Sequence, residues 1–223
     1  MATSYRGFDD ADGISDWSQV AVTSGHTDPA WSVVSTNQVQ ATSASSHNEA
    51  LVWDDIDADA NRDNVEILAQ VYVDSTSTTQ RCLAVRISTS GGSRNGYAIR
   101  FRTNSFDTYR FNGSTFTQIS TASVSLSAGW YNVRFRVNGS SIRARYWADG
   151  GSEGGTWDCD GTDATYSTAG HVGLLKGANT NTQLWRYFGV GTNGDTAPSS
   201  GGGGGGSASM MPRRAFPRPI LLF

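Results

Sequence analysis

Hydrophobic and polar residues alternate along much of the chain, and the clearest alternation lies between residues 129 and 150. From 131 to 137 every odd position is apolar and every even position is polar, which predicts a strand with one buried and one solvated face. The pair Asn138-Gly139 is typical of a two-residue hairpin turn, because such turns need positive φ at their central residues. A hairpin with this turn would pair Phe135 with Ile142 and Val133 with Ala144.

The same pattern predicts further strands along the chain. They lie at 4–8, 49–53, 65–73, 81–88, 96–102, 106–111, 115–119, 170–175 and 184–190. Trp17 and Trp31 flank polar, turn-rich connections, and Cys159 is assigned to a loop. No segment shows the 3.6-residue period of a helix. Many strands at short spacing predict an all-β fold, a two-sheet antiparallel β-sandwich.

The composition narrows the class of protein. Of the 223 residues 26 are glycine, as expected for a domain with many turns. No stretch is long and apolar enough to insert into a membrane. The first residues show no secretion signal, so we expect a protein made in the cytoplasm. Cys82 and Cys159 are interpreted as two free thiols, with a disulfide as the alternative.

Charge is distributed unevenly along the chain. All 20 acidic residues precede Gly201, whereas 3 of the 17 basic residues (Arg213, Arg214 and Arg218) follow it, so the two parts carry −6 and +3. An acidic body argues against nucleic acid as a partner.

The end of the chain differs in character from the body. We divide the chain into a sandwich at 1–196, a Gly/Ser linker at 197–209 and a basic, apolar arm at 210–223. The six consecutive glycines at 201–206 favour a flexible linker. The arm is extended because its prolines prevent a helix, and it is interpreted as a docking arm for a partner, with a disordered tail as the alternative. Its candidate docking residues are Met211, Arg213, Arg214, Phe216, Arg218, Ile220, Leu221, Leu222 and Phe223.

Several motifs together suggest a known fold. They are Phe8-Asp9-Asp10, VEILAQVYV at 65–73, GYAIRFR at 96–102, GWYNVRFRVNGSSIRARYW at 129–147, AGHVGLL at 169–175 and FGVGT at 188–192. Over residues 4 to 194 the chain resembles the concanavalin A-like, laminin-G-type jelly-roll domains. More narrowly, it resembles those of bacteriophage virion proteins and of bacterial glucanase-like or lectin-like modules.

This resemblance implies a structural protein of a phage particle, either a head decoration or a tail or fibre appendage. The arm would bind other virion proteins, the chain would be located in the virion as a homo-oligomer or in many copies, and glycan binding would be a secondary role. The alternative is a carbohydrate-binding module or glycoside hydrolase of the same class. Hydrolysis needs paired carboxylates at a fixed separation. The matching strand at 65–73 holds Glu66 alone, so we expect no catalytic residues and no enzyme.

The acidic loop before this strand is the candidate metal site. Counted from Asp55, six oxygen-bearing side chains fall at positions 1, 3, 5, 7, 9 and 12, the spacing of a calcium loop. They are Asp55, Asp57, Asp59, Asn61, Asp63 and Glu66. Ala60 stands where such a loop needs glycine, so a solvated acidic loop is the alternative. No other cofactor is expected.

Arginines on the polar sides of the strands form the candidate ligand site. The predicted binding residues are Arg100, Arg102, Arg134, Arg136, Arg143 and Arg145, together with Trp157 in a glycine-rich loop. Arg86 also falls on the polar side of its strand. If their strands share a sheet, its outer face is positive and suits acidic groups, since guanidinium forks match carboxylates and phosphates. The alternative is that these arginines pair with the chain's own aspartates.

Overall fold

The structure is a computed structural model of the chain. It describes residues 3–6, 14, 17–22, 30–35, 38–42, 48–53, 63–75, 81–88, 93–177 and 181–199, and for 3–6, 81 and 82 the backbone alone. The predicted docking arm at 210–223 lies outside these residues. Among the described residues no helix is long and apolar enough to cross a membrane.

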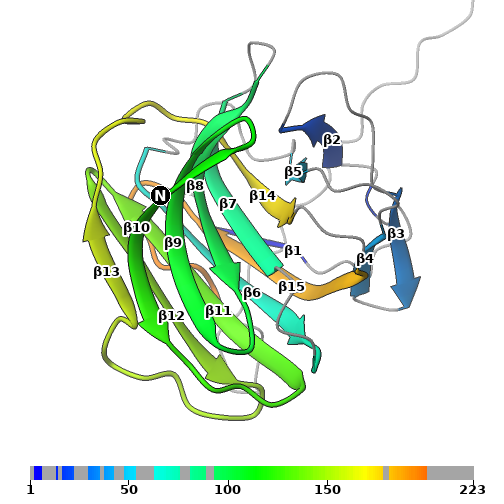
Figure 1. Cartoon of the computed structure of the whole chain (residues 1–223). Coiled ribbons are helices and arrows are strands. Elements are labelled where there is room, and N and C mark those ends of the chain that lie inside the picture. Colours follow the sequence, from blue (N-terminus) through cyan, green and yellow to red (C-terminus); the bar gives the residue numbers. More distant parts are fainter. Residues whose placement is uncertain are drawn as a thin grey trace, which may run out of the picture.

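The described residues form two antiparallel sheets that pack face to face (Figure 1). Sheet A has eight strands in the order β13-β12-β11-β6-β15-β4-β3, and β1 also pairs with β15. Its strands are β1 (Thr3–Arg6), β3 (Ala30–Ser35), β4 (Gln38–Thr42), β6 (Val65–Val73), β11 (Gly129–Asn138), β12 (Ser141–Ala148), β13 (Cys159–Thr162) and β15 (Gln183–Gly191). Sheet B has seven strands in the order β10-β9-β8-β7-β14-β5-β2. They are β2 (Trp17–Ala21), β5 (Glu49–Trp53), β7 (Arg81–Ile87), β8 (Asn95–Phe101), β9 (Ser105–Asn112), β10 (Thr115–Ser123) and β14 (His171–Lys176). The predicted all-β sandwich is thus confirmed.

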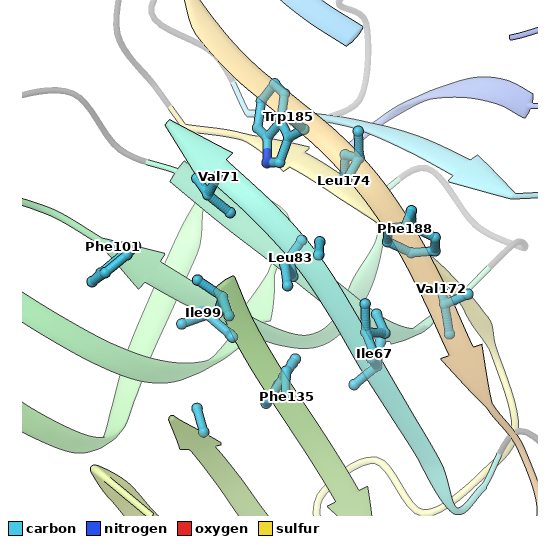
Figure 2. Packing of buried hydrophobic residues seen from close by; sticks show 14 of the residues in the cluster. Ile67, Val71, Leu83, Ile99, Phe101, Phe135, Val172, Leu174, Trp185 and Phe188 are labelled. Atoms are coloured by element: carbon cyan, nitrogen blue, oxygen red, sulfur yellow. The ribbon is translucent and has the colours of Figure 1, made fainter. Parts of the chain in front are cut away.

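The core lies between the sheets and is built from the inward residues of the alternating strands. Figure 2 shows Ile67, Phe135 and Trp185 of sheet A facing Leu83 and other apolar side chains of sheet B. Each of these four side chains is fully buried. Burying such large apolar surfaces is the main stabilising term of the fold.

The hairpin β11–β12 forms as predicted, but with another turn. Phe135 pairs with Ala144 rather than Ile142, and Asn138 pairs with Ser141. The two central residues of the turn are therefore Gly139 and Ser140, and Gly139 takes φ +57°. Moving the turn by one residue shifts the pairing by two, so every side chain stays on its predicted face.

One other prediction is wrong: Cys159 is the first residue of β13, not a loop residue. Trp17 is the first residue of β2 and Trp31 lies in β3, two strands that the alternation did not predict. Trp17 stacks on Trp53 and Trp31 packs against Trp185, so aromatic contacts fix these short strands. Cys159 is a free, fully buried thiol, and burial raises its pKa to about 12.

A C-terminal strap, defined as residues 192–199, folds back over the outer face of sheet A. The chain reverses at Asn193-Gly194, both with positive φ. The backbone of Ala197 then donates to Glu66 (3.0 Å) and accepts from Arg134 (3.2 Å). Gly189 lies beneath the strap, where a Cβ would come within 3.0 Å of the Pro198 carbonyl oxygen. The sandwich therefore includes Ala197 and Pro198, which the sequence analysis assigned to the linker.

Candidate functional site

Four of the predicted arginines lie together on the outer face of sheet A. Arg134 and Arg136 lie on the same face of β11. Arg134 pairs directly with Arg145 of β12, and Arg136 pairs with Arg143. Four like charges this close would repel one another without counter-charges. The nearby carboxylates therefore decide whether this face can bind an acidic ligand.

Glu66 of β6 is the central carboxylate. It lies directly opposite Arg136 and forms ion pairs with Arg134 through one oxygen and with Arg136 through the other. The side chains of Glu66 and Arg134 are only 1% and 4% exposed. Burial alone would lower the pKa of Arg134, but hydrogen bonds and charges from Glu153 and Glu66 outweigh it, and the pKa is raised.

Two more carboxylates complete this set, which we call the arginine lattice: Arg134, Arg136, Arg143 and Arg145 with Glu66, Glu153 and Asp160. Glu153, from the loop after β12, accepts from Arg134 at 2.5 Å and also pairs with Arg145. Arg143 pairs with Asp160 at 3.0 Å. All four arginines thus pair within the protein, but only Arg143 pairs with an aspartate, as the alternative interpretation expected, whereas the other three pair with glutamates.

Trp157 joins the lattice through its ring. The Arg145 guanidinium lies 4.5 Å and that of Arg136 5.7 Å from the ring centroid, within the range of cation–π attraction. The structure therefore brings Trp157 to the predicted arginines, where it packs against guanidinium groups that already have carboxylate partners.

The remaining predicted arginines lie on sheet B, so the proposed single positive face does not form. Arg100 of β8 pairs with the buried Asp107 of β9 at 3.2 Å and stacks over Tyr109. Arg102 follows β8. Arg86, in a left-handed conformation with φ +50°, donates to the backbone oxygens of Asp63 and Tyr166.

The candidate calcium loop is described only in part. Asp55, Asp57, Asp59 and Asn61 lie outside the described residues, and within the described ranges no three His, Cys, Asp or Glu side chains cluster as metal ligands would. Glu66 points to Arg134 and Arg136, and both its oxygens are engaged there. It is therefore not available as the sixth ligand, and calcium binding by the other residues stays a prediction.

An open site that the sequence pattern did not predict lies at the rim of the sandwich. We call it the rim pocket: a half-open hollow of about 340 Å³ between the β9–β10 hairpin and the segment after β13. Its lining residues are Arg110, Phe111, Asn112, Thr115, Thr117, Thr165 and Tyr166. Its volume falls at the small end of the range for ligand pockets.

A hydrogen-bond network holds Arg110 in this pocket. Its Nη1 donates to Asp163 (2.8 Å) and to the Thr165 hydroxyl (2.6 Å). Asp163 also accepts from the Tyr97 hydroxyl (2.9 Å) and the Thr165 backbone N–H (2.8 Å). Burial alone would raise the pKa of Asp163, but the hydrogen bonds from Thr165 and Tyr97 and the Arg110 charge hold it below its usual value.

Several polar groups of the pocket keep their hydrogen-bonding capacity. Within the described part of the chain, nothing accepts from Nε or Nη2 of Arg110, and the Thr115, Thr117 and Tyr166 hydroxyls make no hydrogen bond. The Tyr166 ring packs on Tyr97 at 5.7 Å between centroids. Such convergent polar groups beside an aromatic ring are what a small polar ligand needs.

One sequence signal could have located this site. In β9 the inward residues include Phe106 and, by alternation, Arg110, and a charged residue at an inward position marks a rim or a site. Its neighbours Thr165 and Tyr166 come from an irregular segment that no periodicity places.

The fold is shared with solved structures of low sequence identity. The carbohydrate-binding module CBM66 from Bacillus subtilis is 14% identical, with a TM-score of 0.56 over 82% of this chain and 96% of that one. The exoplasmic/lumenal domain of VIP36, in a form bound to Ca²⁺ and Man3GlcNAc, is 12% identical, with a TM-score of 0.54 over 84% and 89%. The potassium-bound carbohydrate recognition domain of Emp46p is 10% identical, with a TM-score of 0.54 over 81% and 91%. The sequence itself matches no family model and no curated protein. These likenesses establish the fold, a two-sheet β-sandwich shared with these domains.

Proposed function

We propose that this chain is a carbohydrate-binding β-sandwich displayed on a bacteriophage particle, held there by its C-terminal arm. The rim pocket carries the binding part of this proposal. Here the described structure offers donors and hydroxyl groups that the protein itself does not use, beside the ring of Tyr166.

The chemistry of the rim pocket suits a sugar unit. Nε and Nη2 of Arg110 can donate to neighbouring sugar hydroxyls, and the Thr115 and Thr117 hydroxyls can both donate and accept. The apolar face of a sugar can pack on the Tyr166 ring. The resemblance of the sandwich to a carbohydrate-binding module and a carbohydrate recognition domain supports the same ligand class.

The test is binding of the full chain to a broad panel of immobilised glycans, with Arg110→Gln as the variant. Loss of one or two hydrogen bonds to a charged donor costs about 1.5–3 kcal/mol, so we expect affinity to fall roughly 10- to 100-fold. Arg143→Gln is the matched control, because its ion pair is exposed, with side chains 43% and 51% accessible. A panel without any hit, or equal binding by both variants, would contradict the assignment.

We propose binding without catalysis. In the described residues, both oxygens of Glu66 are engaged by arginines, which leaves this carboxylate no role as nucleophile or acid. Glycans that bind should therefore be recovered intact. Shortened products after incubation with pure protein would favour the glycoside hydrolase alternative.

Display on a particle is the second part of the proposal. Attachment through residues 210–223 would place many copies on one surface, and multivalency would make weak sugar binding effective. We expect a chain lacking residues 200–223 to fold and bind glycan but to be absent from purified particles. Normal incorporation of this shortened chain would contradict the role of the arm, and it would leave the sugar assignment untouched.

A further inference from the structure

One edge of sheet A carries exposed apolar side chains. Val33 and Val34, 39% and 45% exposed, are the large hydrophobic residues that lie exposed among those the structure describes. Both belong to β3, the last strand of sheet A, which of the described strands pairs only with β4.

This edge also lacks the usual protection against strand addition. Free edges normally carry charged residues, because unpaired backbone groups attract other strands. Neither β3 nor β4 contains a charged residue, and the sequence has none from Pro29 to Asn48. The pairing of β3 with β4 is interrupted after Val33, so the regular part of the edge is Ala30–Val33.

The chain itself holds a segment that matches this edge. Ile220–Phe223 is apolar and its side chains carry no charge, and four residues is also the length of Ala30–Val33. Its own side chains, Ile220 and Leu222 on one face with Leu221 and Phe223 on the other, would cover apolar surface on both sides of an added strand.

The point where the chain leaves the sandwich makes the contact reachable. The strap ends over β15, which pairs with β4, and β4 pairs with β3. A strand added outside β3 would lie three strand spacings from β15, which amounts to about 15 Å. The 20 residues from 200 to 219 span roughly 25 Å as a flexible chain. Such a tether gives an effective concentration on the order of millimolar at β3.

We propose that Ile220–Phe223 docks as an added strand on the β3 edge of its own sandwich. The arm is then stored on the molecule that carries it, and a partner on the particle must compete for it. This inference extends the proposed attachment role of the arm and is independent of the rim pocket.

The test is disulfide trapping in the full chain. Ser32→Cys on β3 is combined with Leu221→Cys in the arm, and Thr117→Cys on the edge strand β10 of sheet B replaces Ser32→Cys in the matched control. Cys82→Ser is present in both, and the buried Cys159 does not compete, because burial raises its pKa to about 12.

We expect the Ser32→Cys pair to close within the monomer at least about tenfold faster than the control, since docking adds to the tethering that both pairs share. Adding Val33→Thr and Val34→Thr should abolish this advantage. Equal rates for the two pairs would overturn the inference, and so would cross-linked dimers in place of closed monomers. Neither result would bear on sugar binding or on incorporation into particles.

Discussion

Arg134 in the arginine lattice and Arg110 in the rim pocket both extend from strands and both pair with carboxylates. All three nitrogens of Arg134 donate to protein oxygens of Glu66, Glu153 and Ala197. Among the described residues, the side chain of Arg110 finds acceptors for Nη1 alone. Arg134 is therefore closed to ligands while Arg110 is open, although the sequence marks the arginine lattice more strongly. A cluster of arginines is thus a weaker sign of a binding site than a single arginine with unused donors.

Of the substitutions that test this comparison, Glu66→Ala should lower the unfolding free energy most. Glu66→Ala leaves Arg136 without a carboxylate partner and Arg134 with Glu153 alone. Removing one partner of a buried ion pair costs about 3–5 kcal/mol of unfolding free energy. Urea unfolding measures the loss.

Asp160→Ala is the control for Glu66→Ala. It breaks the exposed pair with Arg143 and should cost about 0–1 kcal/mol. A similar small loss for Glu66→Ala would show that the lattice is not structural.

The next largest loss of stability is expected at Gly191, against which the strap packs. A Cβ at Gly191 would overlap the Asp195 carbonyl oxygen and lie 2.7 Å from the Thr196 carbonyl carbon. We expect Gly191→Ala to lower the unfolding free energy by about 1–3 kcal/mol, because overpacking displaces the strap. Gly154→Ala has open space around its Cβ and is the matched control. Equal stability of the two variants would mean that the strap does not rest on β15.

Loss of the arginine in the rim pocket should affect the unfolding free energy much less. Arg110→Gln breaks a partly exposed pair, so its unfolding free energy should change by less than about 1 kcal/mol. Calorimetry of this variant beside Glu66→Ala would thus separate the binding arginine from the structural ones. A loss as large as that of Glu66→Ala would assign Arg110 to the core structure instead.

A change of pH should have the smallest effect on stability and on glycan affinity. Asp163 has a lowered pKa in the folded protein, so the stability it contributes is present above its unfolded pKa of about 4 and is lost as pH falls through the folded value. Glycan affinity should therefore stay constant from pH 5 to pH 8 and decline only below about pH 4. Titration calorimetry across this range is the measurement. A midpoint near pH 6 would show that another group controls the pocket.

The sequence predicted the architecture well because alternation reports directly on burial. β5 and β6 begin and end at the predicted residues, and the residues of β11 and β12 face as expected. β3 escaped prediction because its six residues, AWSVVS, do not alternate regularly, and β4 because its alternation covers only five residues. β13 escaped because it has four residues, one of them glycine.

The site was harder to predict because its residues meet only through the fold. Alternation placed Arg134 on an outer face correctly, but its partner Glu66 is 68 residues away in sequence. Arg110 and Asp163 are 53 residues apart. No local pattern reports such pairs, so the sequence could suggest arginine chemistry without showing which arginines remain open.

The strap also determines how the sandwich would bear a mechanical load. A pull on the chain beyond Ser199 would first peel the strap, whose contacts to Glu66, Arg134 and Tyr187 would open one after another. The force would reach β15 only afterwards. That strand is hydrogen-bonded to β6 on one side and to β4 and β1 on the other, so it would have to shear many bonds at once. Under load the strap would thus detach before the sandwich unfolds.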